Sequence, residues 1–303
     1  MRASLHARGI RYFDAIRRCG SIREAARRLH VSSSAVNRQL LQLEAEVGEP
    51  LFERLPRGMQ LTPAGEVFAR HVINVLQDAE RMAGELDSLR GLRRGSVDVI
   101  AVEALSSAFL PAVLQEMNRR YPAVRISIRM MESHAAGVAV AAGEADVALA
   151  FLRQKIASLR QVAVGRFFAG AIVPPGHPLA VAAHVTGAQL TPFPLVLPGP
   201  GLSFFPEIHA AVTRNRRQPE VVLETGSLTL MRELVRRGVG IAVMNRFGIE
   251  REVDEGALRF IPVRPGIASD LGAYVRSERS LPPAVDAFTQ VVRAEIEAAL
   301  AAA

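Results

Sequence analysis

The chain has 303 residues, about twice the length of one domain, so we expect two or three compact units. Its 49% apolar and 22% charged residues are typical of a globular protein and exclude a disordered chain. No apolar run approaches the roughly 18 residues of a membrane span, and arginines interrupt any signal-peptide core, so we expect a cytoplasmic protein that does not bind membranes. Cys19 is the only cysteine, which excludes an internal disulfide and multi-thiolate metal sites.

The positive charge is concentrated near the start of the chain. The net charge is +7, and eleven arginines and six carboxylates give residues 1–60 a charge of +5. Such a patch suits phosphate binding, and a solvated basic face is the alternative until a motif supports binding.

The first fifty residues predict three short helices. The first runs from about Ile10 to Arg18, and the second starts at a Ser-x-x-Glu capping box of Ser21 and Glu24. The third follows the serines at 32–34, ends at Gly48 and has an apolar stripe. This stripe comprises Val36, Leu40, Leu43 and Val47. The short connection between the second and third helices has the spacing of a helix-turn-helix.

A hairpin and a long helix follow. Strand candidates at 51–54 and 59–61 flank the turn Pro56-Arg57-Gly58 and predict a wing. Thr62 before Pro63 is typical of a helix start. The helix carries a heptad seam, which predicts pairing with a second copy, and the alternative is an amphipathic helix packed on its own domain. The seam comprises Phe68, Val72, Val75, Ala79, Met82, Leu86 and Leu89.

Beyond a polar hinge at 91–95, strands alternate with helices, and the first three strands predict a parallel sheet with right-handed crossovers. Strands are expected at 97–102, 124–130, 147–151, 171–173, 195–197, 221–223, 241–244 and 271–276, before a closing helix at 282–301. The predicted fold class is therefore α plus α/β. It comprises a winged helix-turn-helix at 1–61, a linker helix at 62–90, and a two-lobed α/β domain at 96–303. Lobe I takes about 96–165 and 267–303, and lobe II about 166–266.

These segments resemble the LysR-type transcriptional regulators over essentially the whole chain. The strongest matches are Gly20-Ser21-Ile22-Arg23-Glu24-Ala25-Ala26, Leu29-His30-Val31-Ser32, Leu43-Glu44, Gly48, Leu51-Phe52-Glu53-Arg54 and Leu61-Thr62-Pro63-Ala64-Gly65. Looser matches are 177–180 and 234–242. The resemblance implies a DNA-binding winged helix-turn-helix, a dimerising linker helix, and an effector domain like a periplasmic binding protein. It also implies homodimers or dimers of dimers, an operator with an interrupted dyad in double-stranded DNA, a small-molecule effector, contact with RNA polymerase, and no cofactor or metal.

The recognition helix is expected to read DNA from its exposed first turns. Asn37 can pair with adenine, and Arg38 with guanine or a phosphate. Ser32 is favoured as a helix cap over a phosphate contact, and Arg54 is either a DNA contact or a structural salt-bridge partner. The candidate DNA-binding residues are Ser32, Ser33, Ser34, Asn37, Arg38, Arg54 and Arg57. Relatives usually carry glutamine at position 33 and serine at 37, so base reading is expected to differ here.

An effector is expected in the cleft where strands of both lobes end, an arrangement that favours anionic or aromatic molecules. Matched position by position, the family resemblance implies the candidates Ala104, Leu105, Ser106, Ser133, His134, Phe151, Ser203, Thr225, Gly226 and Ser227. Ser106 and Ser227 are equally plausible as helix caps, and His134 as a surface residue. Relatives often have a hydroxyl at Ala104, and Glu103 would repel an anion. Asn245 replaces the usual proline and could face the cleft.

Two other functions are less favoured. A solute-binding protein shares the cleft but requires export and has no use for residues 1–90. An enzyme is disfavoured because the histidines lack metal spacing, no Gly-x-Ser-x-Gly elbow occurs, and Gly199-Pro200-Gly201 lacks the third glycine of a dinucleotide loop. Glu132, Ser133 and His134 are adjacent in sequence, but a catalytic triad converges in space. We therefore expect no catalytic residues.

Overall fold

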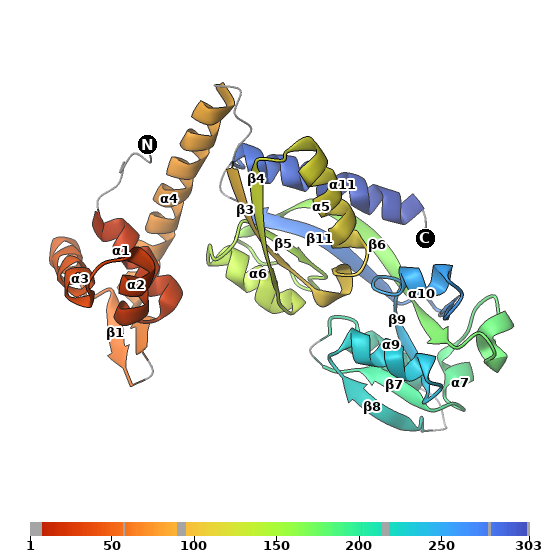
Figure 1. Ribbon diagram of the computed structural model, residues 1–303. Coiled ribbons are helices and arrows are strands. Elements are labelled where there is room, and N and C mark those ends of the chain that lie inside the picture. The colour runs from red at the N-terminus through yellow and green to blue at the C-terminus, as the bar shows by residue number, and fades with distance from the viewer. Residues whose placement is uncertain are drawn as a thin grey trace. The chain divides into compact units, whose positions relative to one another are not determined.

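The computed structural model describes residues 8–56, 58–89, 95–200, 202–213, 218–277 and 280–301. The chain divides into two compact units, the first with α1–α4 and the second with the sheet from β3 to β11 and its helices. Figure 1 draws the first in red to orange and the second in yellow to blue.

The first unit has the predicted winged helix-turn-helix order. Its elements are α1 (Arg8–Cys19), α2 (Ile22–Leu29), α3 (Ser33–Val47), β1 (Phe52–Leu55), β2 (Gly58–Leu61) and α4 (Pro63–Leu89). The Ser21 hydroxyl accepts the Glu24 N–H at 3.4 Å, which caps α2. The Glu24 carboxylate instead pairs with Arg27 at 2.8 Å, so only half of the predicted capping box forms.

A single core joins these helices to the wing and to the start of α4. Phe13 packs against the rings of Phe52 and Phe68 at centroid distances of 5.0 and 4.9 Å. Val36 and Leu40 are buried as expected, but Val47 is 40% exposed. Val47 is the last residue of α3, where Gly48 turns the chain away with a φ of 84°.

The predicted seam of α4 has two different parts. Phe68 and Val72 pack into the core of their own unit, which corrects the expectation that the whole seam faces a second copy. Farther along, Val75 and Ala79 are half-buried, while Met82 and Leu86 are 38% and 45% exposed. The side chain of Leu89 lies outside the described residues, as do the hinge residues 90–94.

The described part of the second unit contains one nine-stranded sheet in the order β4-β3-β5-β11-β6-β9-β7-β8, with β10 paired to β6. The strands are β3 (Gly95–Ala101), β4 (Val124–Met130), β5 (Val147–Ala150), β6 (Leu159–Val173), β7 (Leu195–Pro198), β8 (Val221–Thr225), β9 (Ile241–Asn245), β10 (Arg259–Pro262) and β11 (Ala268–Arg276). Figure 1 shows α5 (Phe109–Arg120) and α11 (Pro283–Ala301) on one side of the lobe I strands and α6 (Ser133–Ala141) on the other.

Lobe II carries α7 (Gly187–Leu190), α8 (Phe205–Thr213), α9 (Leu228–Arg236) and α10 (Glu250–Asp254). Both α8 and α9 contact strand β7. Two short 3₁₀ helices complete the unit, η1 (Glu103–Leu105) in lobe I and η2 (Pro178–Val181) in lobe II.

The parallel pairing predicted for the first three strands is confirmed, and the complete sheet is mixed. The pairs β3/β4, β3/β5, β7/β8 and β7/β9 are parallel. In contrast, β11 runs antiparallel to β5 and β6, and β6 runs antiparallel to β9 and β10. The long strand β6 was predicted only at its last three residues. It crosses between the lobes, because Leu159–Phe168 pair with β11 and Ala169–Val173 pair with β9 and β10.

Candidate nucleic-acid interface and effector cavity

The start of α3 is capped from within the serine cluster. The Ser32 hydroxyl accepts the Ala35 N–H at 3.2 Å, and its oxygen lies 3.0 Å from that of Ser34. Ser32 therefore has the capping role that the sequence favoured. Ser33 and Ser34 are exposed on the first turn of α3.

Two basic side chains flank the exposed face of α3. Arg54 on β1 donates from Nη2 to the Asn37 carboxamide oxygen at 2.7 Å, so the wing is tied to the recognition helix. Arg38 is exposed and has no ion pair or hydrogen bond with any described residue. Arg38 is thus available to an external anion, whereas Arg54 already orients an amide. Arg57 lies outside the described residues.

Glu44 positions α3 in a way that sequence reasoning missed. Its carboxylate accepts the backbone N–H groups of Leu51 at 2.8 Å and Phe52 at 3.2 Å. These bonds fix the last turn of α3 to the start of β1, the strand that carries Arg54. The only sequence signal was the place of Glu44 in the family motif.

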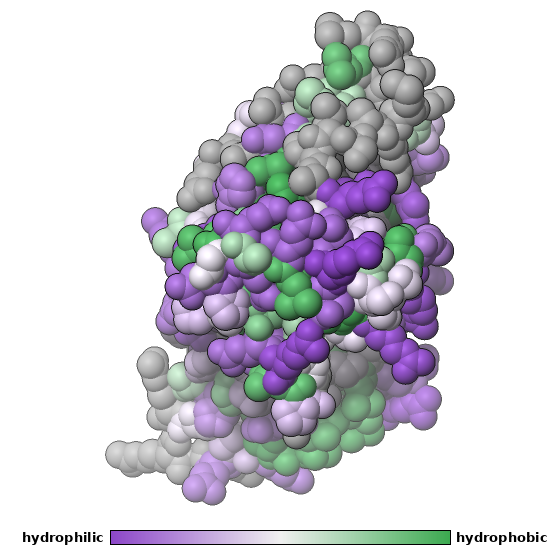
Figure 2. Space-filling view, turned by 90° about the vertical axis from the view of Figure 1, so that its left-hand side faces the viewer, coloured by the Kyte–Doolittle hydropathy of each residue, from purple (hydrophilic) through white to green (hydrophobic). Residues whose placement is uncertain are grey.

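The basic charge of the first unit is partly neutralised internally. Asp14 is 8% exposed and binds Arg17 at 2.9 Å and Arg18 at 2.8 Å. Among the described residues, Arg23 and Arg28 of α2 have no such partner. Figure 2 shows mostly hydrophilic side chains across the middle of the view, with hydrophobic spots between them. A polar surface of this kind suits contact with a phosphate backbone.

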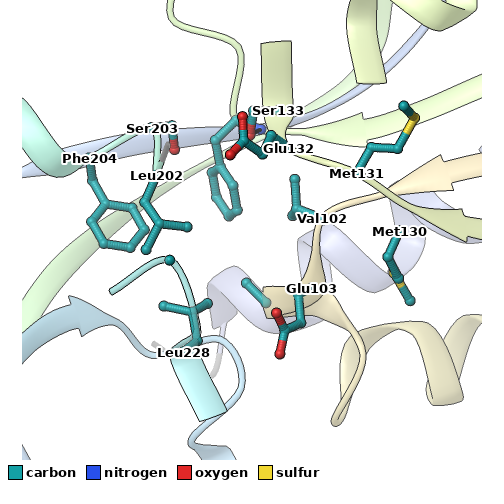
Figure 3. Close-up of a pocket in the computed structure, with 13 residues that line it drawn as sticks. Val102, Glu103, Met130, Met131, Glu132, Ser133, Leu202, Ser203, Phe204 and Leu228 are labelled. Atoms are coloured by element: carbon teal, nitrogen blue, oxygen red, sulfur yellow. Dashed lines mark hydrogen bonds between the residues drawn. The ribbon is translucent and has the colours of Figure 1, made fainter. Parts of the chain in front are cut away.

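A cavity of about 210 Å³ lies where strands of both lobes end. Figure 3 shows one wall from lobe I and another from lobe II. The lobe I wall consists of Val102, Glu103, Ala104, Met130, Met131, Glu132, Ser133 and Phe151. The lobe II wall consists of Leu202, Ser203, Phe204, Gly226 and Leu228.

Half of the predicted effector residues line this cavity. They are Ala104, Ser133, Phe151, Ser203 and Gly226. Within the wall, the Ser133 hydroxyl accepts the Phe151 N–H at 3.2 Å, so these two neighbours hold each other in place.

The other five predicted residues lie outside the lining, each for a local reason. Leu105 is fully buried in the core, and His134 is exposed on α6. The Ser106 hydroxyl donates to the Glu103 carbonyl at 2.7 Å. Ser227 caps α9 by accepting the Leu230 N–H at 3.3 Å, and the Thr225 hydroxyl accepts the Ser227 N–H at 3.1 Å.

Sequence reasoning also missed most of the apolar lining. Polar side chains at strand ends gave a signal, whereas methionine, leucine and phenylalanine at the same places were indistinguishable from core residues. Asn245 does not line the cavity. It is 3% exposed, and its amide donates to the Ser269 hydroxyl at 2.9 Å.

The charge of the cavity is opposite to the expected one. Two lining residues, Glu103 and Glu132, carry carboxylates, and none of the described lining residues is Arg, Lys or His. Glu103 accepts the Thr229 hydroxyl at 3.1 Å, which joins lobe I to lobe II beside the cavity. The expectation was an anionic or aromatic effector, and among the described lining residues no side chain would neutralise an anion.

Several further contacts connect the lobes. Arg153, after β5, binds Glu207 of α8 at 2.7 Å. Phe247 packs against Phe167 at 4.5 Å and against Phe151 at 5.9 Å. Because Phe151 also lines the cavity, a bound molecule would touch the same ring that packs on the segment between the lobes.

Comparisons with known proteins cover both units. Residues 7–66 match the model of the bacterial regulatory helix-turn-helix protein, lysR family, and residues 90–297 match the LysR substrate binding domain. The transcriptional activator protein LysR of Escherichia coli is 29% identical over 243 residues, which are 80% of this chain and 78% of that protein.

Solved structures share the fold. ArgP from Mycobacterium tuberculosis matches with a TM-score of 0.70 and 18% identity over 97% of this chain and 98% of its own. Full-length CbnR in complex with its target DNA matches with a TM-score of 0.58 and 22% identity over 95% and 99%.

Proposed function

The chain belongs to the family of LysR-type transcriptional regulators, and we propose that its first unit recognises an operator while the cavity of its second unit senses a small molecule. Members of this family are DNA-binding regulators with an effector-binding domain and are not enzymes. None of the described helices is both long and apolar enough to cross a membrane.

The observation that carries the DNA-binding proposal is the exposed first part of α3. Ser33, Ser34 and Arg38 face outward, and the wing holds Asn37 from the side. Phosphate contacts from arginines position such a helix, and polar side chains in its first turns read base edges in the major groove. We assign phosphate or guanine contact to Arg38 and adenine contact to Asn37.

Two copies are proposed to bind together at an interrupted dyad. The exposed Met82 and Leu86 on α4 support a helix pair, since apolar side chains at seam positions gain by leaving water. A dimer of dimers and contact with RNA polymerase are further proposals that follow from family membership.

The effector is proposed to act by shifting the balance between lobe arrangements. The Glu103–Thr229 and Arg153–Glu207 contacts join the lobes, and the cavity lies at the same junction. A molecule that binds one arrangement better than another shifts the population toward it.

The test is a footprint on the DNA beside the chain's own gene. Purified full-length protein should protect two half-sites separated by one or more helical turns, about 10 base pairs each. Arg38→Ala should lose this protection at the same protein concentration. Equal protection of unrelated DNA, or no protected dyad at any site in a genomic library, would contradict the proposal.

A further inference from the structure

We propose that the effector is a small organic cation, an apolar body that carries one amine or guanidinium group. The inference rests on the proposed function, because it assigns a chemical class to the effector of the same cavity. It depends on three features of the lining, namely its apolar walls, its two carboxylates and its lack of basic side chains.

The walls suit an apolar body. The apolar side chains come from both lobes, and they are Met130, Met131, Phe151, Leu202, Phe204 and Leu228. Thioethers adapt their shape to a ligand, and phenyl rings attract a cation to their faces. The cavity of about 210 Å³ suits a small molecule.

Two carboxylates define the charge. In the view of Figure 3, Glu132 and Glu103 lie on opposite sides of the space between the walls. Glu132 has no ion pair or side-chain hydrogen bond with any described residue. Glu103 accepts the Thr229 hydroxyl through Oε1 at 3.1 Å. Because a carboxylate only accepts hydrogen bonds, N–H donors of a cation are its natural partners.

The helix ends near the cavity do not reverse this charge. Glu132 is the N-cap residue of α6, so a negative charge already lies at the positive end of that helix dipole. The first turn of α9 is capped by Ser227. The charge of Glu132 therefore disfavours an anion at the start of α6, and Ser227 already accepts one N–H group at the start of α9.

One basic residue, Arg232, lies close to the Glu103–Thr229 contact, but its charge is paired with another carboxylate. Arg232 donates to the Thr229 hydroxyl at 3.4 Å and to the Gly248 carbonyl. It also pairs with Glu252 at 3.2 Å, and it is not part of the lining. Its charge is thus balanced within lobe II.

The test compares three probes that share a phenyl body and differ in charge. Calorimetric titration of the full-length protein uses 2-phenylethylamine, 2-phenylethanol and phenylacetate. We expect the amine to bind about tenfold more tightly than the alcohol, because it gains one charge-assisted hydrogen bond. Phenylacetate should bind most weakly of the three. Glu132→Gln and Glu103→Gln should each reduce the advantage of the amine several-fold and leave the affinity for the alcohol unchanged.

Glu297→Gln on α11 is the matched control, because Glu297 is exposed and does not line the cavity. It should retain the wild-type preference for the amine. Tightest binding of phenylacetate, no binding of any probe up to its solubility limit, or an amine preference that survives both lining substitutions would overturn the inference. DNA protection by the wild-type protein is measured separately, so a failed operator test and a failed probe test are distinguishable.

Discussion

The guanidinium of Arg54 donates a hydrogen bond to the carboxamide oxygen of Asn37 at 2.7 Å, linking the wing strand β1 to the recognition helix α3. The sequence left Arg54 as either a DNA contact or a salt-bridge partner. In the structure Arg54 holds the side-chain amide of Asn37 on the recognition helix.

The first prediction concerns this pair. Arg54→Ala and Asn37→Ala should each weaken operator binding, and the double variant should lose less than the sum of the two. The difference between the summed single losses and the double loss in binding free energy should be about 1–3 kcal/mol, the range for a hydrogen bond with one charged partner. Binding curves for the four proteins on one operator measure it. Strict additivity would show that the two side chains act on DNA independently.

A second prediction concerns Arg38, which has no partner among the described residues. Arg38→Ala should weaken binding to all duplexes. It should also reduce the slope of log affinity against log salt concentration by about 0.9, which corresponds to the loss of one phosphate contact. Titrations at several salt concentrations provide the slope. Arg70→Ala, an exposed arginine on α4, serves as the control. A slope unchanged by Arg38→Ala would remove this residue from the phosphate contacts.

Glu44 allows a test of how the wing is attached. Glu44→Ala removes the carboxylate that accepts the backbone N–H groups of Leu51 and Phe52, and both donors lose this partner. We expect a loss of about 1–3 kcal/mol in the free energy of unfolding of the first unit, because each unpaired buried donor is costly. Glu44→Gln keeps an acceptor and should lose less. Thermal melts followed in the first unit compare them, and equal losses would mean that packing, not hydrogen bonding, explains the role of Glu44.

The fourth prediction separates the two parts of α4. Leu86→Glu should shift the protein toward monomers, because it places charge on the exposed seam. Val67→Glu is the control on the same helix, since Val67 is 60% exposed and lies outside the seam. Sedimentation measures the oligomeric state. If both variants remain as associated as the wild type, the seam is not the interface.

Local signals in the sequence predicted the first unit well. Ser32 and Thr62 cap the helices that follow them, and Gly48 ends α3 with a positive φ, as expected from short-range chemistry. Comparison with known families confirmed the winged helix-turn-helix and the two-lobed domain. The helix caps depend on residues within a few positions of one another, so one sequence is enough to predict them.

Long-range pairing was beyond the reach of these signals. Strand β6 contains Arg160, Gln161 and Arg166, which hid it from a hydrophobic pattern. Its partners are distant in the chain, since Leu159 pairs with Arg276 of β11 and Ile172 with Ala242 of β9. Likewise, the heptad pattern alone does not show that Phe68 and Val72 pack into the core that contains Phe13.

The sequence by itself determined the class of the protein, because caps, periodicity and motif spacing act locally. Only the tertiary structure decided which seam residues remain exposed, that Arg54 reaches Asn37, and that Glu103 and Glu132 line one cavity. These relationships join segments that are distant in the chain. Burial and charge there depend on how strands and helices pack, which no local pattern contains.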